Sequence, residues 1–313
     1  MDYVSIKDII DKSNKENKPV YQVVMEEQAD SSGISIEDLY EKMQTAYIAM
    51  CDSVDKGLNE RSTLKIEQND GSKIFKKYVD DGKSIFGSKI GLVMARAMAV
   101  SEVNASMGRI VASPTAGSCG ILPASLISIK DIYDLSDEQI IHSMFTASAV
   151  GMVIANVSSI AGATGGCQAE CGAAQAMAAA AIVELLSGDN DMISNAIAIA
   201  IKNIEGLVCD PVAGLVECPC IKRNASGAMN AIIAADMALA GIKSIIPVDE
   251  VILAMKQVGD IMDDRLKETA KGGLATTETG KALKKKIFGW YKCLIYCFCF
   301  KTYQFRKRTF KIL

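Results

Sequence analysis

Five cysteines in two short clusters are the residues of this chain best suited to bind a metal. The first cluster, GGCQAECG, contains Cys167 and Cys171, and the second, CDPVAGLVECPC, contains Cys209, Cys218 and Cys220. Glycines and prolines at both clusters indicate breaks between helices, where unpaired backbone N–H groups can donate hydrogen bonds to sulfur. The pattern therefore predicts loops that hold a metal or a metal–sulfur cluster.

The spacing of these cysteines leaves three interpretations open. Structural zinc sites usually pair cysteines as C-x-x-C, and neither C-x-x-x-C nor C-P-C has that spacing. Iron–sulfur clusters accept more varied spacing, and their ligands are often followed by proline, as Cys218 is. The third interpretation is that these are buried thiols without a metal, because free cysteine often behaves as a small apolar residue.

The single histidine, His142, follows Ile140 and Ile141 in an expected helix, where a lone histidine is more often a packing residue than a catalytic one. A histidine-based catalytic triad within this chain is therefore not expected. If the protein is an enzyme, either a metal carries most of the chemistry or a second chain donates a base.

A second segment suited to chemistry, SPTAGSCG, begins at Ser113 and precedes an expected helix. Small hydroxyl residues and free backbone N–H groups at the start of a helix predict a site for a carboxylate or a phosphate. A well-capped helix after a tight turn is the alternative interpretation. The segment is not a P-loop, because it lacks the lysine of that motif.

Helical periodicity dominates the chain and predicts an all-α fold, a compact multi-helix domain with Gly/Pro-rich loops between helices at the cysteine clusters. Ser35 begins a candidate capping box, and apolar residues then recur at helical spacing until Gly57. The segment 61–87 contains an Asn-Asp-Gly turn and predicts a loop or a short hairpin. Further helices are expected near 89–103, 120–130, 137–161, 171–187, 191–204, 224–241 and 248–262.

Charge and composition change abruptly near the end of the 313 residues. Residues 284–313 carry nine basic and no acidic side chains, whereas the rest carries 25 basic and 37 acidic ones, a net charge of −12. An acidic body is not expected to bind nucleic acid. We expect one catalytic domain over 1–289, with an N-terminal helical part and variable loop over 1–87 and a helical core over 88–289. The tail 290–313 is expected to lie outside the fold.

The start of the chain and its apolar stretches bear on localisation. The first residues are polar and amphipathic rather than of signal-peptide type, which predicts a cytoplasmic protein with reduced thiols. Residues 143–169 contain no charge, so a membrane span has to be considered. Their glycine, serine and asparagine content favours a central helix packed on all sides, and no membrane association is expected.

Three motifs taken together, SPTAGSCGILP, GGCQAECGAA and CDPVAGLVECPCIKRN, resemble those of the α subunit of the iron–sulfur-dependent L-serine dehydratases. The similarity extends from SIKDIIDKSNKENKPVYQVVMEEQA to KETAKGGLATTETGKAL and covers nearly all of the chain up to about Gly289. It implies a [4Fe–4S] cluster that is bound by Cys167, Cys209 and Cys220 and has one iron not ligated by protein. Cys171 and Cys218 are then non-ligands.

The resemblance also implies an activity, that of a lyase, L-serine ammonia-lyase. The open iron would act as a Lewis acid on the substrate hydroxyl, water would be eliminated, and the resulting imine would be hydrolysed to pyruvate and ammonia. A β subunit supplies a histidine-bearing segment in two-chain members, so the base is expected from a partner chain and the α chain alone is expected to be inactive. The residues implied in binding the L-serine carboxylate are Asn104, Ser113, Thr115, Ala116, Gly117 and Ser118.

Two alternatives remain at this point. One is a pyridoxal phosphate-dependent amino-acid deaminase, for which Lys222 is the nearest candidate Schiff-base lysine, although the strands of such a scaffold are not expected here. The other is a zinc-binding or purely structural helical subunit. The tail departs from the family and resembles translation through a frameshift or past a lost stop. Its Cys293, Cys297 and Cys299 are further candidates for the open iron, as a C-terminal cysteine is in single-chain relatives.

Overall fold

The computed structural model of the chain describes residues 3–67 and 70–289. All regular secondary structure in these two ranges is helical, which confirms the expected all-α fold. The short 3-10 helices are η1 Ala116–Ser118, η2 Val212–Gly214, η3 Asp264–Leu266 and η4 Gly273–Thr276. The α-helices are α1 Ile6–Glu16, α2 Val20–Ser32, α3 Ile36–Asn59, α4 Gly71–Asp80, α5 Gly87–Ala105, α6 Ile121–Tyr133, α7 Asp137–Val157, α8 Gly162–Leu185, α9 Asn190–Lys202, α10 Cys220–Leu239, α11 Val248–Ile261 and α12 Glu278–Phe288.

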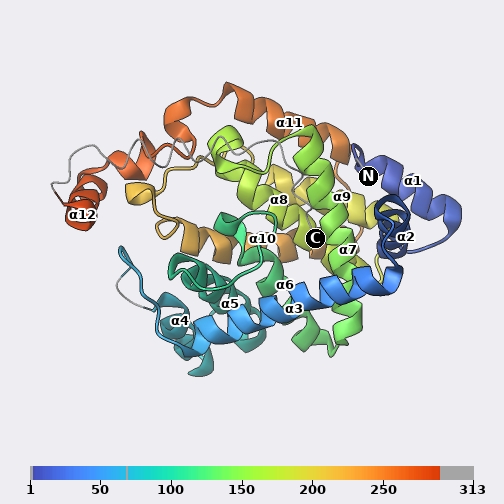
Figure 1. Cartoon of the computed structure of the whole chain (residues 1–313), viewed down its shortest axis with the longest axis horizontal. Coiled ribbons are helices and arrows are strands. Elements are labelled where there is room, and N and C mark those ends of the chain that lie inside the picture. The colour runs from blue at the N-terminus through green and yellow to red at the C-terminus, as the bar shows by residue number, and fades with distance from the viewer. Residues whose placement is uncertain (1–2, 68–69, 290–313) are drawn as a thin grey trace.

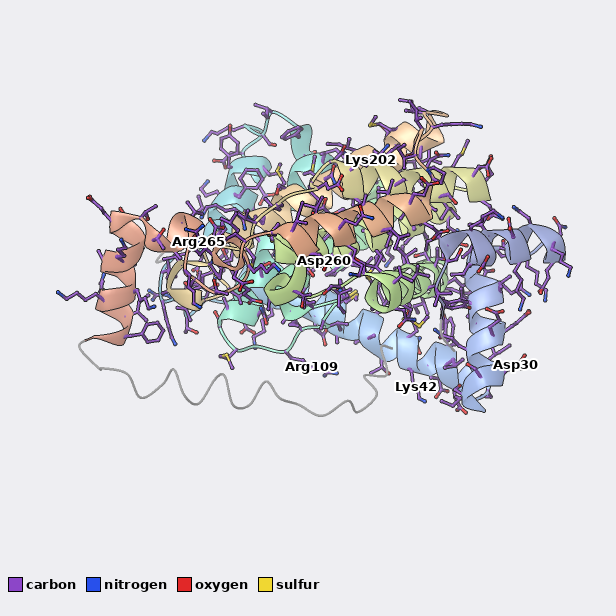
Figure 2. All side chains as sticks on the ribbon, turned by 90° about the horizontal axis from the view of Figure 1, so that it is seen from above. Asp30, Lys42, Arg109, Lys202, Asp260 and Arg265 are labelled. Atoms are coloured by element: carbon purple, nitrogen blue, oxygen red, sulfur yellow. The ribbon has the colours of Figure 1, made fainter. Side chains whose placement is uncertain are left out.

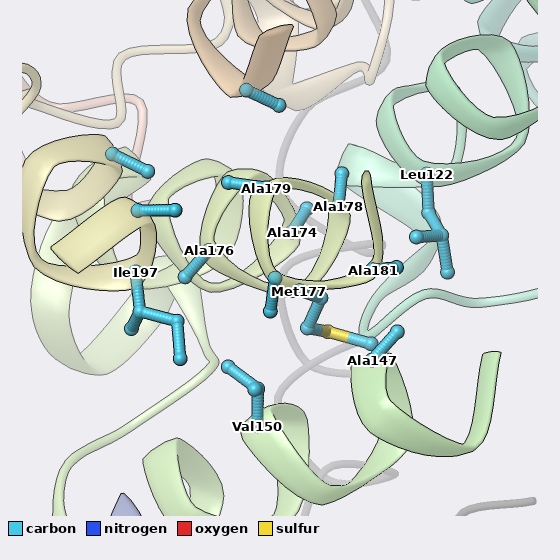
Figure 3. Packing of buried hydrophobic residues seen from close by; sticks show 14 of the residues in the cluster. Leu122, Ala147, Val150, Ala174, Ala176, Met177, Ala178, Ala179, Ala181 and Ile197 are labelled. Carbon is cyan, nitrogen blue, oxygen red and sulfur yellow. The ribbon is translucent and has the colours of Figure 1, made fainter. Parts of the chain in front are cut away.

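Helix α8 lies at the centre of the molecule, with α7, α9, α10, α6 and α11 packed against it (Figure 1). Its second half is rich in alanine, and residues 173–183 are all buried. Because alanine side chains are small, the neighbouring helices can approach the α8 backbone closely on every side. Met177 has one of the longer side chains of this stretch, and it extends towards α7 next to Ala147 (Figure 3). Helix α8 is therefore the element on which the others are assembled.

Helix α4 differs from the expectation of a loop or short hairpin over 61–87. It begins at Gly71, the glycine of the Asn-Asp-Gly sequence, and packs along α5. Val79 is 1% exposed, and the backbone N–H of Ser72 donates to Glu102 of α5 at 3.0 Å. The local sequence gives this helix only a weak signal, because its stability depends on contacts with a helix that follows it in the chain.

Polar side chains at the first residues of helices agree with the sequence signals. Ser35 accepts a hydrogen bond from the backbone N–H of Asp38 at 3.0 Å, and α3 begins at the next residue, as expected. Helix α7 begins with a complete capping box between Ser136 and Gln139. Satisfying the free N–H groups of a first turn in this way fixes where a helix starts.

Helix α7 contains most of the uncharged stretch that raised the question of a membrane span. Among the described residues it is the one helix long and apolar enough to cross a membrane by length and composition. Its most apolar window is 72% buried inside the protein, which is the arrangement of a core helix. The charged side chains labelled in Figure 2 lie on the exterior: Asp30, Lys42, Arg109, Lys202, Asp260 and Arg265.

Candidate metal centre

A break in helix α8 positions the first cysteine cluster. The sequence predicts a helix from 171, but α8 starts at Gly162 and is interrupted at Gly166, which has φ 74° and ψ −175°. A side chain at Gly166 would lie 2.7 Å from the Met262 sulfur and 2.9 Å from the Leu207 carbonyl oxygen, so only glycine fits. Cys167 is thus the first residue after the break and lies in a helix rather than in the expected loop, whereas Cys171 lies in a helix as expected.

The break also brings the chain that carries Cys209 next to α8. The N–H of Gln168 donates to the Leu207 carbonyl at 2.9 Å, and its side-chain oxygen accepts from the N–H of Gly206 at 2.8 Å. Cys209 itself donates through its backbone N–H to the carbonyl of Leu266 at 2.8 Å. These backbone bonds hold Cys209 between α8 and the segment that follows α11.

Helix α10 supplies Cys220 as its first residue. Asn224, one turn later and fully buried, donates to the Cys220 carbonyl at 2.9 Å and to the Gly117 carbonyl at 2.8 Å. Its side-chain oxygen accepts from the N–H of Gly120 at 2.9 Å. One amide side chain therefore joins the start of α10 to the segment around η1, where the predicted substrate residues lie.

The sulfur atoms of the first two segments are in direct contact. The Cys167 and Cys171 sulfurs are 3.3 Å apart, and the thiols of Cys171 and Cys209 both hydrogen-bond to Cys167. Together with the nearby Arg223 guanidinium, these bonds lower the pKa of Cys167 well below its ordinary value. The pKa of Cys220 is raised, first by burial and then by the charge on Cys167. One buried thiolate, at Cys167, is thus favoured among four thiols.

The candidate donors of this site are cysteine thiols, the usual protein ligands of iron–sulfur clusters. Within the described ranges, no three His, Cys, Asp or Glu side chains converge closely enough to coordinate one metal ion. The thiols of Cys167, Cys209 and Cys220 come from three separate segments and are all buried. A cluster of several iron and sulfide atoms spans more space than one ion does, and cysteine thiolates are its usual protein ligands. The residues present therefore fit such a group.

Arg223 provides positive charge beside these sulfurs. Its guanidinium donates to the carbonyl of Val208 at 2.8 Å and to Asp210 at 2.9 Å, the residues on either side of Cys209. The second oxygen of Asp210 accepts from the N–H of Leu274 at 2.8 Å. Arg223 thus fixes the backbone around Cys209 while its charge stabilises the Cys167 thiolate.

Five of the predicted substrate residues lie on one segment, and the sixth, Asn104, contacts that segment from α5. Asn104 donates to the Ala116 carbonyl at 3.0 Å, and the hydroxyls of Thr115 and Ser118 are 3.1 Å apart. Thr115 also donates a short hydrogen bond to Glu170 of α8. The hydroxyl of Ser113 is buried and has no hydrogen-bond partner among the described residues.

Glu170 was not singled out by the sequence analysis, yet it contacts both parts of the site. It lies one helical turn after Cys167, and a side chain at Gly117 would come within 2.5 Å of its carboxylate. Burial raises the pKa of Glu170 to about 7, and the charges on Cys167 and Glu268 add to this effect. A signal was present in the sequence, because Glu170 is the one charged residue between His142 and Glu184.

Gly162 lies near one thiol and two carboxylates of the site. A methyl group on Gly162 would lie 3.1 Å from the Cys209 sulfur, 3.3 Å from a Glu268 oxygen and 3.5 Å from a Glu170 oxygen. Burial, followed by the charge on Cys167, raises the pKa of Glu268 as well. The site thus contains two carboxylates that the cysteine motifs did not predict.

The segment after α3 covers the second cysteine cluster. The buried carboxylate of Glu217 accepts hydrogen bonds from the backbone N–H groups of Lys65, Ile66 and Glu67 at 2.6 to 3.2 Å. Lys222 forms an ion pair with Glu67 on the same segment. The variable region therefore lies directly over the loop that carries Cys218, rather than forming a separate unit.

Neither Lys222 nor His142 has the environment of a catalytic group. The Lys222 side chain is 65% exposed and ion-paired, whereas a Schiff-base lysine is activated by burial or by a neighbouring cation. His142 is stacked on Tyr21 with ring centres 4.4 Å apart and has Tyr40 against its edge, and burial lowers its pKa. The expectation that His142 is a packing residue is confirmed.

Comparison with known proteins identifies the family. A family model described as serine dehydratase alpha chain matches residues 15–275. The chain is 47% identical to the probable L-serine dehydratase alpha chain of Bacillus subtilis over 286 residues, covering 91% of this chain and 95% of that protein. It is 45% identical to the L-serine dehydratase alpha chain of Peptoniphilus asaccharolyticus over 280 residues, covering 89% and 96% respectively.

A longer relative matches over a smaller part. The L-serine dehydratase of Streptomyces coelicolor is 45% identical over 181 residues, which cover 57% of this chain and 40% of that protein. The present chain belongs to the serine dehydratase alpha chain family. This membership confirms the resemblance inferred from the three motifs.

Proposed function

We propose that this chain is the α subunit of an L-serine dehydratase, a lyase that converts L-serine into pyruvate and ammonia. Family membership and the names of the relatives from Bacillus subtilis and Peptoniphilus asaccharolyticus support the reaction. The structural observation that carries the proposal is the buried contact of the Cys167 thiol with those of Cys171 and Cys209, next to the hydroxyl-rich segment around Thr115.

In this proposal Cys167, Cys209 and Cys220 hold a [4Fe–4S] cluster with one iron not ligated by protein. When bound, the cluster supplies a Lewis acid that makes the substrate hydroxyl a better leaving group. The low pKa of Cys167 supports the assignment, because the thiolate is the form of cysteine that binds metals. In this proposal Cys171 and Cys218 are not ligands.

The residues of this chain bind and orient L-serine. The segment from Ser113 to Ser118, held by Asn104 and Asn224, would position the substrate carboxylate against the thiol-lined side of α8. Burial of the thiols excludes bulk water from the reacting atoms, which strengthens electrostatic interactions there. The substrate loses water to form an enamine, which becomes an imine and is hydrolysed to pyruvate and ammonia.

The base that removes the α-proton is assigned to a β subunit. The one histidine of this chain, His142, is held between tyrosines of α2 and α3, and those helices carry none of the ligand cysteines. We therefore infer an αβ heterodimer or a multiple of it, located in the cytoplasm. Residues 1–289 form the catalytic domain in this proposal, with the cluster-binding core at 88–289, and the tail 290–313 lies outside the described residues.

Anaerobic co-expression with a candidate β chain tests the proposal. We expect a brown complex that contains iron and sulfide, bleaches in air and forms pyruvate from L-serine, and an α chain that is inactive alone. An active complex with zinc or no metal would refute the cluster, and a colourless complex activated by pyridoxal phosphate would refute the whole assignment. Full activity of the α chain alone, at normal iron content, would refute the role of the β subunit.

A further inference from the structure

Glu170 connects the substrate segment to the helix that carries Cys167. One oxygen of its carboxylate accepts the Thr115 hydroxyl hydrogen bond, and the other would lie 3.5 Å from a methyl group placed on Gly162, which would itself lie 3.1 Å from the Cys209 sulfur. We propose that Glu170 binds the α-ammonium group of the substrate and so makes the site selective for amino acids over hydroxy acids. This inference rests on the proposed function.

The position of the Glu170 carboxylate is fixed by the substrate segment. Thr115 donates to it from one side, and the backbone N–H of Gly117 also hydrogen-bonds to it. A side chain at Gly117 would lie 2.5 to 2.7 Å from the three carboxylate atoms, so glycine allows this close approach. A carboxylate held in this way is oriented before any substrate arrives, which lowers the entropy cost of binding.

In the described part of the chain, the carboxylates of Glu170 and Glu268 have no ion-pair partner. Among the described residues, no lysine, arginine or histidine forms an ion pair with Glu170 or Glu268. The nearby cation, Arg223, is engaged with Asp210 and directed at the Cys167 thiolate. Buried carboxylates without a cation are costly, and an ammonium group between them would remove much of that cost.

The same contacts orient the substrate. Because Thr115 and Gly117 donate to Glu170, they act on the substrate through Glu170, and contacts with the substrate carboxylate are left to other groups of the Ser113–Ser118 segment. Two carboxylates side by side would repel each other, so the ammonium end of the substrate faces Glu170 and its carboxylate faces away. The hydroxyl of Ser113, which has no partner among the described residues, belongs to the same segment and can donate to that carboxylate.

The test compares Glu170→Gln with Glu184→Gln in the iron-loaded αβ complex. Glu184 is a matched control, because it lies on the same helix, is buried, has a pKa raised to about 7 and accepts a hydrogen bond from a threonine hydroxyl. Calorimetry measures binding of L-alanine and of L-lactate, in which a hydroxyl group replaces the α-ammonium group. Steady-state assays measure kcat and KM for L-serine.

We expect Glu170→Gln to weaken L-alanine binding about 10- to 100-fold, the effect of losing one charge-assisted hydrogen bond, and to raise the KM for L-serine similarly. For Glu170→Gln, L-lactate binding and kcat should stay within about threefold of the parental values. Glu184→Gln should match the parent in L-alanine binding, L-lactate binding, kcat and KM. Equal loss of both ligands, no loss of either, or a fall in kcat with unchanged L-alanine binding would each overturn the proposal.

A second variant covers the outcome in which Glu170→Gln does not load iron. Glu170→Asp keeps the charge and should load iron, with L-alanine binding reduced less than in Glu170→Gln. Failure of both variants to load iron would make Glu170 a structural residue and overturn the proposal. The proposed function fails separately, if the parental complex holds no iron and forms no pyruvate.

Discussion

At the residue scale, the negative charge of the site is concentrated on one sulfur. Cys167 accepts hydrogen bonds from the thiols of Cys171 and Cys209 and lies near the Arg223 guanidinium. The hydrogen bond to Cys167, followed by burial and by the charge on Cys167, raises the pKa of Cys171 and of Cys209, and burial followed by that charge raises the pKa of Cys220. Loading of a cluster therefore has to release protons from Cys209 and Cys220, and it should be favoured at higher pH.

Replacement of single cysteines distinguishes cluster ligands from cysteines that are not ligands. Cys167→Ser, Cys209→Ser and Cys220→Ser should each lose most of the iron bound after anaerobic reconstitution, because a hydroxyl is a poor ligand for this soft site. Cys171→Ser, its sulfur 3.3 Å from that of Cys167, is the matched control and should keep parental iron. Iron and sulfide analysis with visible spectra measures this. Full iron in Cys167→Ser, or loss in Cys171→Ser, would contradict the ligand assignment.

Arg223 is expected to be a positioning residue for the ligand loop. Arg223→Met should weaken cluster retention about 10- to 100-fold, as loss of other supporting contacts at metal sites does. It removes the donors to Val208 and Asp210 and leaves the Asp210 carboxylate buried without its cation. The readouts are the rate of iron loss to a chelator and the cluster reduction potential, both independent of turnover.

Arg96→Met is the control for this substitution. The Arg96 side chain is 14% exposed, against 17% for Arg223, and it also pairs with an aspartate, Asp131. It lies on α5 and contacts Ser128 of α6 rather than a cysteine-bearing segment. Equal rates of iron loss in the two variants would show that Arg223 acts only through general stability.

At the element scale, helix α8 carries different functions at its two ends. Cys167, Glu170 and Cys171 are spaced three and four residues apart and so share one face of its first turns. Near the other end, Glu184 accepts hydrogen bonds from Thr146 and from the backbone N–H of Tyr21, in the first turn of α2. The site and the N-terminal helices are therefore attached to the same rigid element.

The buried Glu184 predicts a pH-dependent stability. Burial raises its pKa from 4.5 to about 7, so the folded state binds this proton more tightly than the unfolded state does. The free energy of unfolding should then fall by about 3 kcal/mol in total as pH rises from about 4.5 to 7. Above pH 7, ionisation of Glu184 should change it little. Glu184→Gln should reduce this slope, with urea unfolding at pH 5 and pH 8 as the measurement. An unchanged slope would mean that Glu184 is ionised throughout.

At the scale of the whole molecule, the described fold ends with α12 at Phe288 and Gly289. Deletion of residues 290–313 should leave iron content, activity with the β subunit and the melting temperature at parental values. The reason is that the family match ends at residue 275 and the basic, aromatic composition of the tail differs from that of the acidic body. A large loss of iron on deletion would assign a role to Cys293, Cys297 or Cys299.

Local sequence was sufficient for the fold class and for many of the helices. Caps such as Ser35, together with apolar residues at a period of 3.6, depend on neighbours within a few residues and can be read directly. The cysteine motifs likewise predicted which thiols to consider. Helix α4 and the first turns of α8 were missed, because α4 depends on packing against α5 and α8 contains a break that only Gly166 allows.

The sequence by itself determined that the chain is helical, which family motifs it carries and which thiols are candidates. The surroundings of those thiols were decided by tertiary structure alone, because their partners come from distant segments. Thr115 hydrogen-bonds to Glu170, which is 55 residues away in the sequence, and Arg223 donates to the carbonyl of Val208, which is 15 residues away. Burial determines the charge state of such groups, and burial is a property of the packed molecule rather than of any local pattern.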